Sequence, residues 1–260
     1  MPIDGYPSAT SVAPGETISF QVSAIPPDLV TISIIKVGAP DQPMLTLSGF
    51  ANAPVIPLRG DEFGFNWPAI AQLTIPNDSA SGLYRVEFTG DQAGAAPPFH
   101  FVVKAVNPGS TSRILLMFPA TTGQAYNNNG PAITGTTGPS LYEFNSPNNF
   151  FVNQVSFDRP GGLDYGREVP FARWFDANGI ATESCTNLDI HQDQTLPLNY
   201  QLVVSMGHDE YWSREMRDAV EAFINGAETL RFSAGTFAGG KSALLGASWF
   251  ATRMQLQIHG

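Results

Sequence analysis

The spacing of apolar residues changes near residue 107, and this change constrains the fold more than any other feature of the sequence. Before it, short apolar runs are separated by Gly, Pro, Asn and Asp about every ten residues, as in antiparallel sandwiches and barrels. After it, continuous apolar runs alternate with segments of helical periodicity, as in parallel sheets covered by helices. A chain of 260 residues also exceeds the usual size of one domain, about 100–150 residues. The sequence therefore predicts an N-terminal β-sandwich over residues 1–106 and an α/β domain over residues 107–260.

The first domain is predicted from alternating strands. Residues 17–23 read TISFQVS and residues 84–88 read YRVEF, so polar and apolar side chains alternate as in antiparallel strands with one buried face. Pro14-Gly15 and Ser81-Gly82 supply turns. The predicted strands are residues 11–12, 17–24, 31–37, 45–47, 72–75, 82–89 and 99–103. Because nothing in this half groups titratable side chains, a structural or binding role is expected for it.

The second domain begins after residues 107–111 (NPGST), which are predicted to be a linker. Residues 113–118 form a continuous apolar run, suited to a strand that is covered on both faces. A helix is predicted over residues 168–178, and another begins with Ser213 as its N-cap and stops at Gly226. Alternation of strands and helices predicts a doubly wound, mostly parallel sheet. Further strands are predicted at residues 180–184, 200–206 and 229–233, and a shortened sheet edge at residues 241–260.

The charge balance excludes several classes of partner. The formal net charge is −10, with 13 Lys and Arg against 23 Asp and Glu, and no stretch gathers the basic residues into a patch. Nucleic acid and anionic membranes are therefore excluded as partners, and no apolar run approaches the roughly 20 residues of a membrane-spanning helix. We expect a soluble protein, either cytoplasmic or exported. Cys185 is the single cysteine, so no internal disulfide can form.

The candidate site residues lie in two loops that follow predicted strands. The first loop runs from residue 119 to Tyr142 and contains Tyr126; the second, residues 207–212 (GHDEYW), contains His208 and Glu210. Ligands of open α/β sheets bind at the carboxyl ends of the strands, so the two loops face one crevice if their strands are neighbours. The sequence contains no nucleophile elbow, no Walker loop and no dinucleotide-binding glycine motif.

These side chains have two interpretations. Two phenols and a carboxylate can bind a hard trivalent metal, which stabilises their deprotonated forms. Alternatively the tyrosines, Tyr211 included, pack at a loop-rich sheet edge. Glu210 precedes a helix N-terminus, where either it or Asp209 can be stabilised by the helix dipole. Asp189-Ile190-His191 is a second polar cluster and is predicted to be a surface loop.

Short motifs along nearly the whole chain carry a family resemblance: GY at residues 5–6, SVAPGE at 11–16, Trp67, SGLY at 81–84, QAYN at 124–127, SLY at 140–142, VSFDRP at 155–160 and GHDEYWS at 207–213. With these motifs the sequence resembles the large subunit of N,N-dimethylformamidase and its relatives. The resemblance implies a β-sandwich attached to a glutamine-amidotransferase-like, flavodoxin-like α/β domain, and a mononuclear ferric ion, Fe(III), held by two tyrosines and one glutamate. By position, the implied metal ligands are Tyr126, Tyr142 and Glu210, with His208 beside the metal as a proton-transfer group.

The function that the resemblance implies is iron-dependent hydrolysis of a non-peptide C–N bond in a small linear amide. Iron would polarise the amide carbonyl and activate a water, and His208 would carry protons to the leaving nitrogen, with Glu210 as the second catalytic residue. A homo-oligomer and a complex with a small subunit both stay open. Glutamine-amidotransferase chemistry is not implied, because its cysteine is missing.

Two other functions stay open. A non-catalytic binding or surface module is motivated by departures from the family: EFNS follows Tyr142 where the family has a His- and Gly-rich stretch, and residues 233–237 (SAGTF) lack an expected asparagine. The chain also ends where further sheet is expected, so the α/β domain is expected to be truncated. A metal-free hydrolase that uses His208 and Glu210 is the third function, and its activity would survive chelation.

Overall fold

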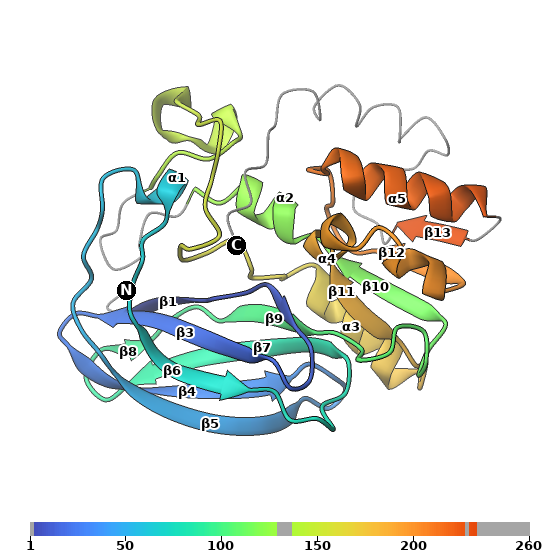
Figure 1. Cartoon of the computed structure of the whole chain (residues 1–260). Coiled ribbons are helices and arrows are strands. Elements are labelled where there is room, and N and C mark those ends of the chain that lie inside the picture. The colour runs from blue at the N-terminus through green and yellow to red at the C-terminus, as the bar shows by residue number, and fades with distance from the viewer. Residues whose placement is uncertain (1–2, 129–136, 227–228, 233–260) are drawn as a thin grey trace.

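The computed structural model of the chain describes residues 3–128, 137–226 and 229–232. It shows a mixed α/β protein whose described residues form sheets of three, six and four strands, with few helices (Figure 1). The first two sheets come from the part of the chain up to Val103, and the third comes from the part that begins at Ile114. Within the described ranges, no helix is long and apolar enough to span a membrane.

Two mostly antiparallel sheets of the first part enclose a common core. Their strands alternate as predicted: Ile18, Phe20 and Val22 of one strand are buried, while Ser19 and Gln21 between them are partly exposed. The three-stranded sheet has the order β1-β3-β6, with β1 Ile3–Pro7, β3 Thr17–Ala24 and β6 Ala69–Thr74. The larger sheet has the order β2-β9-β7-β4-β5, with β2 Ser11–Val12, β9 Phe99–Val103, β7 Gly82–Gly90, β4 Asp28–Lys36 and β5 Gln42–Ala51, and with β8 Gly94–Ala95 beside β7.

The predicted strands of the first part are found, and most have shifted ends. Residues 11–12, 17–24 and 99–103 coincide with β2, β3 and β9. Strand β1 was not predicted, because Asp4, Gly5 and Pro7 are poor strand formers. It forms because it pairs with β3 along its whole length and is buried throughout. The short helix α1 (Gly60–Phe63) was also missed.

The second part contains a parallel sheet with the order β11-β10-β12-β13. Its strands are β10 Ile114–Phe118, β11 Glu183–Thr186, β12 Leu202–Ser205 and β13 Thr229–Phe232. Side chains of β10 alternate between its two faces. Leu115 and Met117 join the core beneath α5, whereas Leu116 and Phe118 join the core shared with α3 and the first part. This explains why the run reads as continuously apolar.

The two helices that the sequence predicts in the second part are both found in the structure. Helix α3 (Glu168–Ala177) and helix α5 (Arg214–Asn225) lie where they were predicted. The Ser213 hydroxyl caps α5 by accepting the N–H of Met216 at 3.1 Å. Helices α2 (Ala120–Ala125) and α4 (Asn187–Gln192) were not predicted, because each is too short to show helical periodicity.

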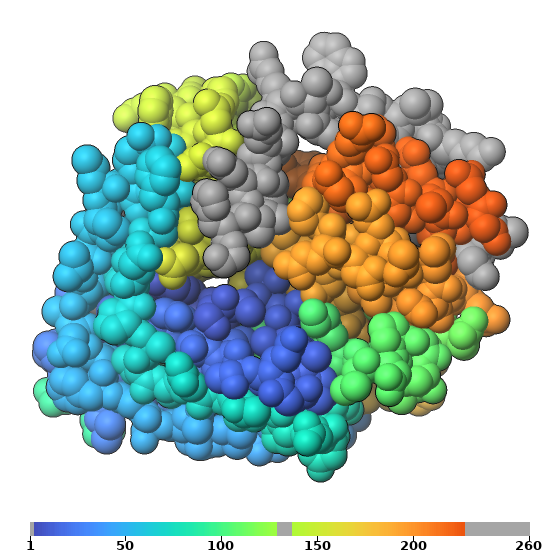
Figure 2. Space-filling view, viewed as in Figure 1, coloured from blue at the N-terminus to red at the C-terminus, as the bar shows by residue number. Residues whose placement is uncertain are grey.

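The two parts are in contact, as Figure 2 shows where the blue segments touch the green and orange ones. Asp41 forms ion pairs with Arg85 and Arg173 at 2.8 and 2.7 Å, and Lys104 forms one with Asp189 at 2.9 Å. A single hydrophobic cluster also runs from the antiparallel sheets to the parallel sheet. The predicted domain boundary at residues 106 and 107 and the doubly wound, glutamine-amidotransferase-like fold stay predictions.

The predicted linker is tied to the parallel sheet by one buried carboxylate. Glu183 of β11 accepts the N–H groups of Gly109 and Thr111 at 2.8 and 2.7 Å and the hydroxyl of Tyr200 at 2.6 Å. The strand that was predicted at residues 180–184 begins and ends later in the chain, at Glu183–Thr186. Residue 233 of the last predicted strand, residues 234–237 and the sheet edge predicted at residues 241–260 lie outside the described residues.

Candidate active site

The two predicted loops lie side by side because their strands pair directly. Strands β10 and β12 are parallel neighbours, with Met117 opposite Ser205 at their carboxyl ends. The chain leaves β10 through Pro119 into α2, and it leaves β12 through Gly207 into the turn before α5. One crevice at the carboxyl edge of the sheet therefore receives residues from both loops.

Tyr126 and Glu210 are in direct contact in this crevice. The Tyr126 hydroxyl donates a hydrogen bond to Glu210 Oε1. Burial, and then the hydrogen bond to this carboxylate, raise the pKa of the Tyr126 phenol well above its usual value. The phenol is therefore protonated at neutral pH unless a cation offsets the negative charge beside it.

Tyr142 packs against Tyr126, with the ring centroids 4.8 Å apart. Its backbone is fixed by two serines: Ser140 Oγ accepts the N–H of Tyr142 at 3.1 Å, and Ser146 Oγ donates to its carbonyl at 2.8 Å. Tyr211 meets Tyr126 edge-on, at 5.5 Å between centroids, and burial raises the pKa of Tyr211 to about 12. The tyrosines thus pack together, as one interpretation expected, and the hydroxyl of Tyr126 contacts Glu210.

His208 contacts the other oxygen of the same carboxylate. Its Nε2 lies 2.8 Å from Glu210 Oε2, and both side chains are about one-third exposed, at 32% and 33%. Despite this short distance, the orientation of the imidazole relative to the carboxylate does not form a hydrogen bond. In the part of the chain that the structure describes, Nε2 has no hydrogen-bond partner. The ring stands edge-on to Tyr126 at 5.7 Å. The structure therefore brings together all four predicted side chains, with Glu210 between Tyr126 and His208.

The turn that carries Glu210 is held by two threonines of α2 that the sequence analysis missed. Thr122 Oγ1 accepts the N–H groups of Glu210 and Tyr211, each at 3.0 Å. Thr121 Oγ1 donates to the carbonyl of Tyr211 at 2.5 Å and accepts from Asn187 Nδ2 at 2.6 Å. The available signal was a pair of threonines in the segment that follows a buried strand, at the end of the sheet where ligands bind.

Neither Asp209 nor Glu210 caps α5. Asp209 accepts hydrogen bonds from Ser205 Oγ at 2.8 Å and Asn187 Nδ2 at 3.0 Å, and burial raises its pKa to about 6. It ties the turn to β12 and α4, and the hydroxyl of Ser213 provides the cap.

The prediction of a surface loop at Asp189-Ile190-His191 is wrong. These residues belong to α4, and Asp189 is 4% exposed. Asp189 caps its own helix through the N–H of Thr186 at 2.7 Å, and it binds Ser11 Oγ at 2.6 Å and Lys104 Nζ at 2.9 Å. An aspartate at the third position of a helix that follows threonine is a capping box, a signal present in the sequence.

A cavity of about 380 Å³ opens beside His208 and Tyr126. Its walls also contain Thr122, Tyr165 and Glu168, which is the first residue of α3. A cavity of this size suits a small organic molecule.

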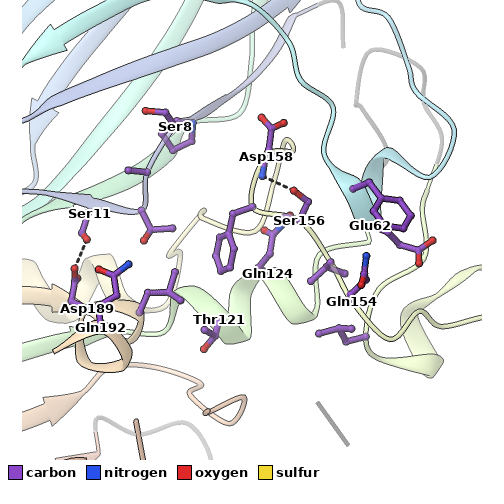
Figure 3. Close-up of a pocket in the computed structure, with 18 of the residues that line it drawn as sticks. Ser8, Ser11, Glu62, Thr121, Gln124, Gln154, Ser156, Asp158, Asp189 and Gln192 are labelled. Atoms are coloured by element: carbon purple, nitrogen blue, oxygen red, sulfur yellow. Dashed lines mark hydrogen bonds between the residues drawn. The ribbon is translucent and has the colours of Figure 1, made fainter. Parts of the chain in front are cut away.

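A larger cavity, of about 550 Å³, lies between the first and second parts of the chain (Figure 3). Thr121 and Gln124 of α2 line it, and the hydrogen bonds from Ser11 to Asp189 and from the N–H of Asp158 to Ser156 lie within its walls. None of the four predicted side chains lines it. We therefore place the candidate site at the smaller cavity.

The chemistry of the donor set fits a hard cation. Tyr126, Tyr142 and Glu210 offer phenol and carboxylate oxygens, which suit Fe(III). Glu210 forms no ion pair with any lysine or arginine of the described residues, and its two oxygens contact His208 and the Tyr126 hydroxyl. Histidine, cysteine, aspartate and glutamate alone form no group of three or more suited to a metal in the described ranges, so the phenols are needed to complete one. Cys185 is buried in β11, where burial raises its pKa, and this does not suit a nucleophile.

Comparisons with known proteins give one informative result. A solved family 123 glycoside hydrolase from Clostridium perfringens, studied for glycolipid glycan hydrolysis, is 8% identical over 81% of this chain, with a TM-score of 0.17 that carries no argument. This chain spans 38% of that structure's length. A comparison with curated proteins finds no match. The family described as "N,N-dimethylformamidase beta subunit-like, C-terminal" matches residues 40–238. Because this match covers more than half of the chain, the chain belongs to the N,N-dimethylformamidase beta subunit-like family.

Proposed function

We propose that the chain is an amidohydrolase of a non-peptide C–N bond in a small linear amide, with Fe(III) held by Tyr126, Tyr142 and Glu210. The observation that carries the proposal is the contact of Glu210 with the Tyr126 hydroxyl on one oxygen and with His208 on the other, beside a cavity. Membership of the N,N-dimethylformamidase beta subunit-like family supports it.

Different residues of the site have different roles in the proposed reaction. Bound Fe(III) would act as a Lewis acid on the amide carbonyl and lower the pKa of a water molecule. His208 Nε2 has no hydrogen-bond partner among the described residues and borders the cavity, so it can move a proton to the leaving nitrogen. Thr122 keeps Glu210 in place by accepting its N–H.

The finer architecture belongs to the same proposal. We expect a β-sandwich domain followed by a glutamine-amidotransferase-like α/β domain, as the family resemblance implies. The family description names a beta subunit, which supports assembly with another subunit. The family resemblance implies that this partner is a small subunit.

Ferric reconstitution with visible spectroscopy tests the metal site. The wild-type chain is expected to show a phenolate-to-iron charge-transfer band, and Tyr126→Phe is expected to remove or shift it. Tyr200→Phe is a matched control, because Tyr200 also donates to a glutamate, Glu183, at 2.6 Å and is not one of the proposed ligands. An iron-loaded wild-type chain without the band, or a band unaffected by Tyr126→Phe, contradicts the ligand assignment.

A non-catalytic binding module is the second candidate. It is favoured by the larger cavity, which lies between the two parts and contains none of the proposed catalytic side chains. Release of amine from a small amide by the iron-loaded chain, lost in Tyr126→Phe, rejects this candidate. Activity that survives removal of iron by a chelator instead supports a metal-free hydrolase that uses His208 and Glu210.

A further inference from the structure

Tyr126 and Tyr142, the two phenols of the proposed iron site, lie apart in the chain and in contact in space. Tyr126 is the C-cap of α2, and its ring packs against that of Tyr142 with 4.8 Å between centroids. Two phenols can bind one ion only if this separation is maintained, and groups outside the ligand set usually maintain it. The side chains that hold the two tyrosine backbones are therefore part of the site.

The side chain of Asn145 links these two backbones. Asn145 is the last residue of a short 3₁₀ turn, η2 (Glu143–Asn145), and is partly buried. Its Nδ2 donates to the carbonyl oxygen of Tyr126 at 2.7 Å, and its Oδ1 accepts the hydroxyl of Ser140 at 2.5 Å. Ser140 Oγ in turn accepts the N–H of Tyr142 at 3.1 Å. One amide and one serine thus join the backbone of Tyr126 to that of Tyr142.

The bridge requires a group that donates and accepts at the same time. The last carbonyl groups of a helix have no donor within the helix, and the Tyr126 carbonyl, at the end of α2, receives the amide N–H instead. A carbonyl oxygen only accepts, so the NH₂ group of Asn145 has to face Tyr126, which leaves the amide oxygen for the Ser140 hydroxyl. Ser140 is fully buried, so its hydroxyl depends on such protein partners.

Further hydrogen bonds fix the turn that carries Asn145. Asn128 Nδ2 donates to the carbonyl oxygen of Asn145 at 2.7 Å, and Ser146 Oγ accepts the N–H of Ser140 at 3.0 Å. Asn145 and Ser146 belong to residues 143–146 (EFNS), the segment whose departure from the family pattern motivated a non-catalytic module. In the structure this segment holds both tyrosines, so its sequence is compatible with a metal site.

We propose that Asn145 is a positioning residue of the iron site, which sets the separation of the two phenols by joining the Tyr126 carbonyl to the serine that holds Tyr142. The inference rests on the proposed function and deepens it, because it names a residue outside the ligand set that fixes the ligand geometry. Asn145 acts through the two tyrosines. Loss of a group that orients metal ligands typically lowers metal affinity about 10- to 100-fold.

Ferric titration of the full chain, followed by visible spectroscopy, gives the first test. Asn145→Ala is expected to weaken iron binding about tenfold or more and to shift the phenolate-to-iron band, because one phenol leaves its position. Asn178→Ala is the matched control. Asn178 Nδ2 also donates to a carbonyl near a helix C-terminus, that of Trp174 in α3 at 2.8 Å, but it has no link to the tyrosines. The control is expected to keep both the affinity and the band of the wild type.

Ring contacts in the metal-free chain give the second test. NMR with ¹³C-labelled tyrosine, assigned by single Tyr→Phe changes, is expected to show contacts from Tyr126 to both Tyr142 and Tyr211 in the wild type. In Asn145→Ala the contact with Tyr142 should weaken or disappear. The contact with Tyr211 does not involve Asn145 and should remain, which shows that the variant is folded.

Ser140→Ala keeps the proposal testable should Asn145→Ala not fold. It removes the other half of the bridge and is expected to weaken the contact between Tyr126 and Tyr142 and the binding of iron in the same way. In the double variant the losses should be less than additive, because both changes break one bridge.

The outcomes separate this proposal from the proposed function. A contact between Tyr126 and Tyr142 that survives in both single variants, or iron affinity and a band that stay at the wild-type values, overturns the inference. If the wild-type chain binds no iron, the proposed metal site is rejected. The ring contacts of the metal-free chain then still decide whether Asn145 sets the separation of the phenols.

Discussion

Replacement of Gly207 by alanine probes how the site is held. Gly207 has φ 59°, a left-handed backbone that disfavours any residue with a Cβ. The added Cβ would also lie 2.6 Å from Glu168 Cδ, well inside the ordinary contact distance between carbon atoms. Since Glu168 is buried behind this contact, its carboxyl group has to leave its position to admit the methyl group.

The two effects give an expected loss of stability of about 2–4 kcal/mol. Left-handed backbone costs an alanine about 1 kcal/mol relative to glycine. Displacement of a buried carboxyl group from its hydrogen-bonding partners adds about 1–3 kcal/mol. His208 and Glu210 follow directly in the chain, so we expect iron binding and activity to fall as well.

Urea unfolding followed by tryptophan fluorescence measures the loss, and a double-mutant cycle assigns its cause. Gly179→Ala is the control, because Gly179 has φ 65° with no atom near its Cβ position, and it is expected to cost only about 1 kcal/mol. In a Glu168→Ala background, Gly207→Ala should also cost about 1 kcal/mol, because the clash is gone. Strictly additive losses, or equal costs at Gly207 and Gly179, would refute the reasoning.

Two further predictions concern the turn before α5 and the junction between the parts. Thr122→Val, which removes the acceptor for the N–H groups of Glu210 and Tyr211, is expected to cost about 1–3 kcal/mol in the same assay and to weaken iron binding. Thr122→Ser keeps the hydroxyl and should stay close to wild type, so equal effects of the two changes would count against this role. His100 of β9 lies at this junction, with its Nδ1 3.1 Å from the carbonyl oxygen of Leu163. Burial lowers the pKa of His100 to about 4, so the unfolded chain binds more protons below about pH 6.5 and stability falls as the pH drops toward 4. Compared with His100→Gln across this range, the wild type should lose up to about 3 kcal/mol more, and parallel curves would contradict the prediction.

The candidate site was predictable to the extent that it depends on strand ends. The continuous apolar run at residues 113–118 and the run at residues 200–206 marked two buried strands, and their following loops contain Tyr126, His208 and Glu210. The strands pair, so the loops meet. The roles of these residues as metal ligands and proton carriers stay predictions. The side chains that hold them in place, Thr122 among them, were not predicted, because short helices show no periodicity.

Burial of polar groups was the least predictable property. Asp189 and Glu168 look like surface residues in the sequence, because most acidic residues are exposed. Both are buried because partners distant along the chain cover them: Ser11 and Lys104 for Asp189, and Gly207 for Glu168. The residues next to Asp189 and Glu168 in the sequence do not indicate these distant partners.

The sequence by itself determined the periodicity of the strands, the cap and end of α5 and the types of side chain available for chemistry, because these depend on residues close together in the chain. Only the tertiary structure decided that Tyr126 meets Glu210, that the carboxyl group of Glu168 rests on Gly207 and that Asp189 is buried. Each of these contacts joins segments that are far apart in the sequence. They form because packing of the sheets and helices brings the segments together, which local preferences cannot specify.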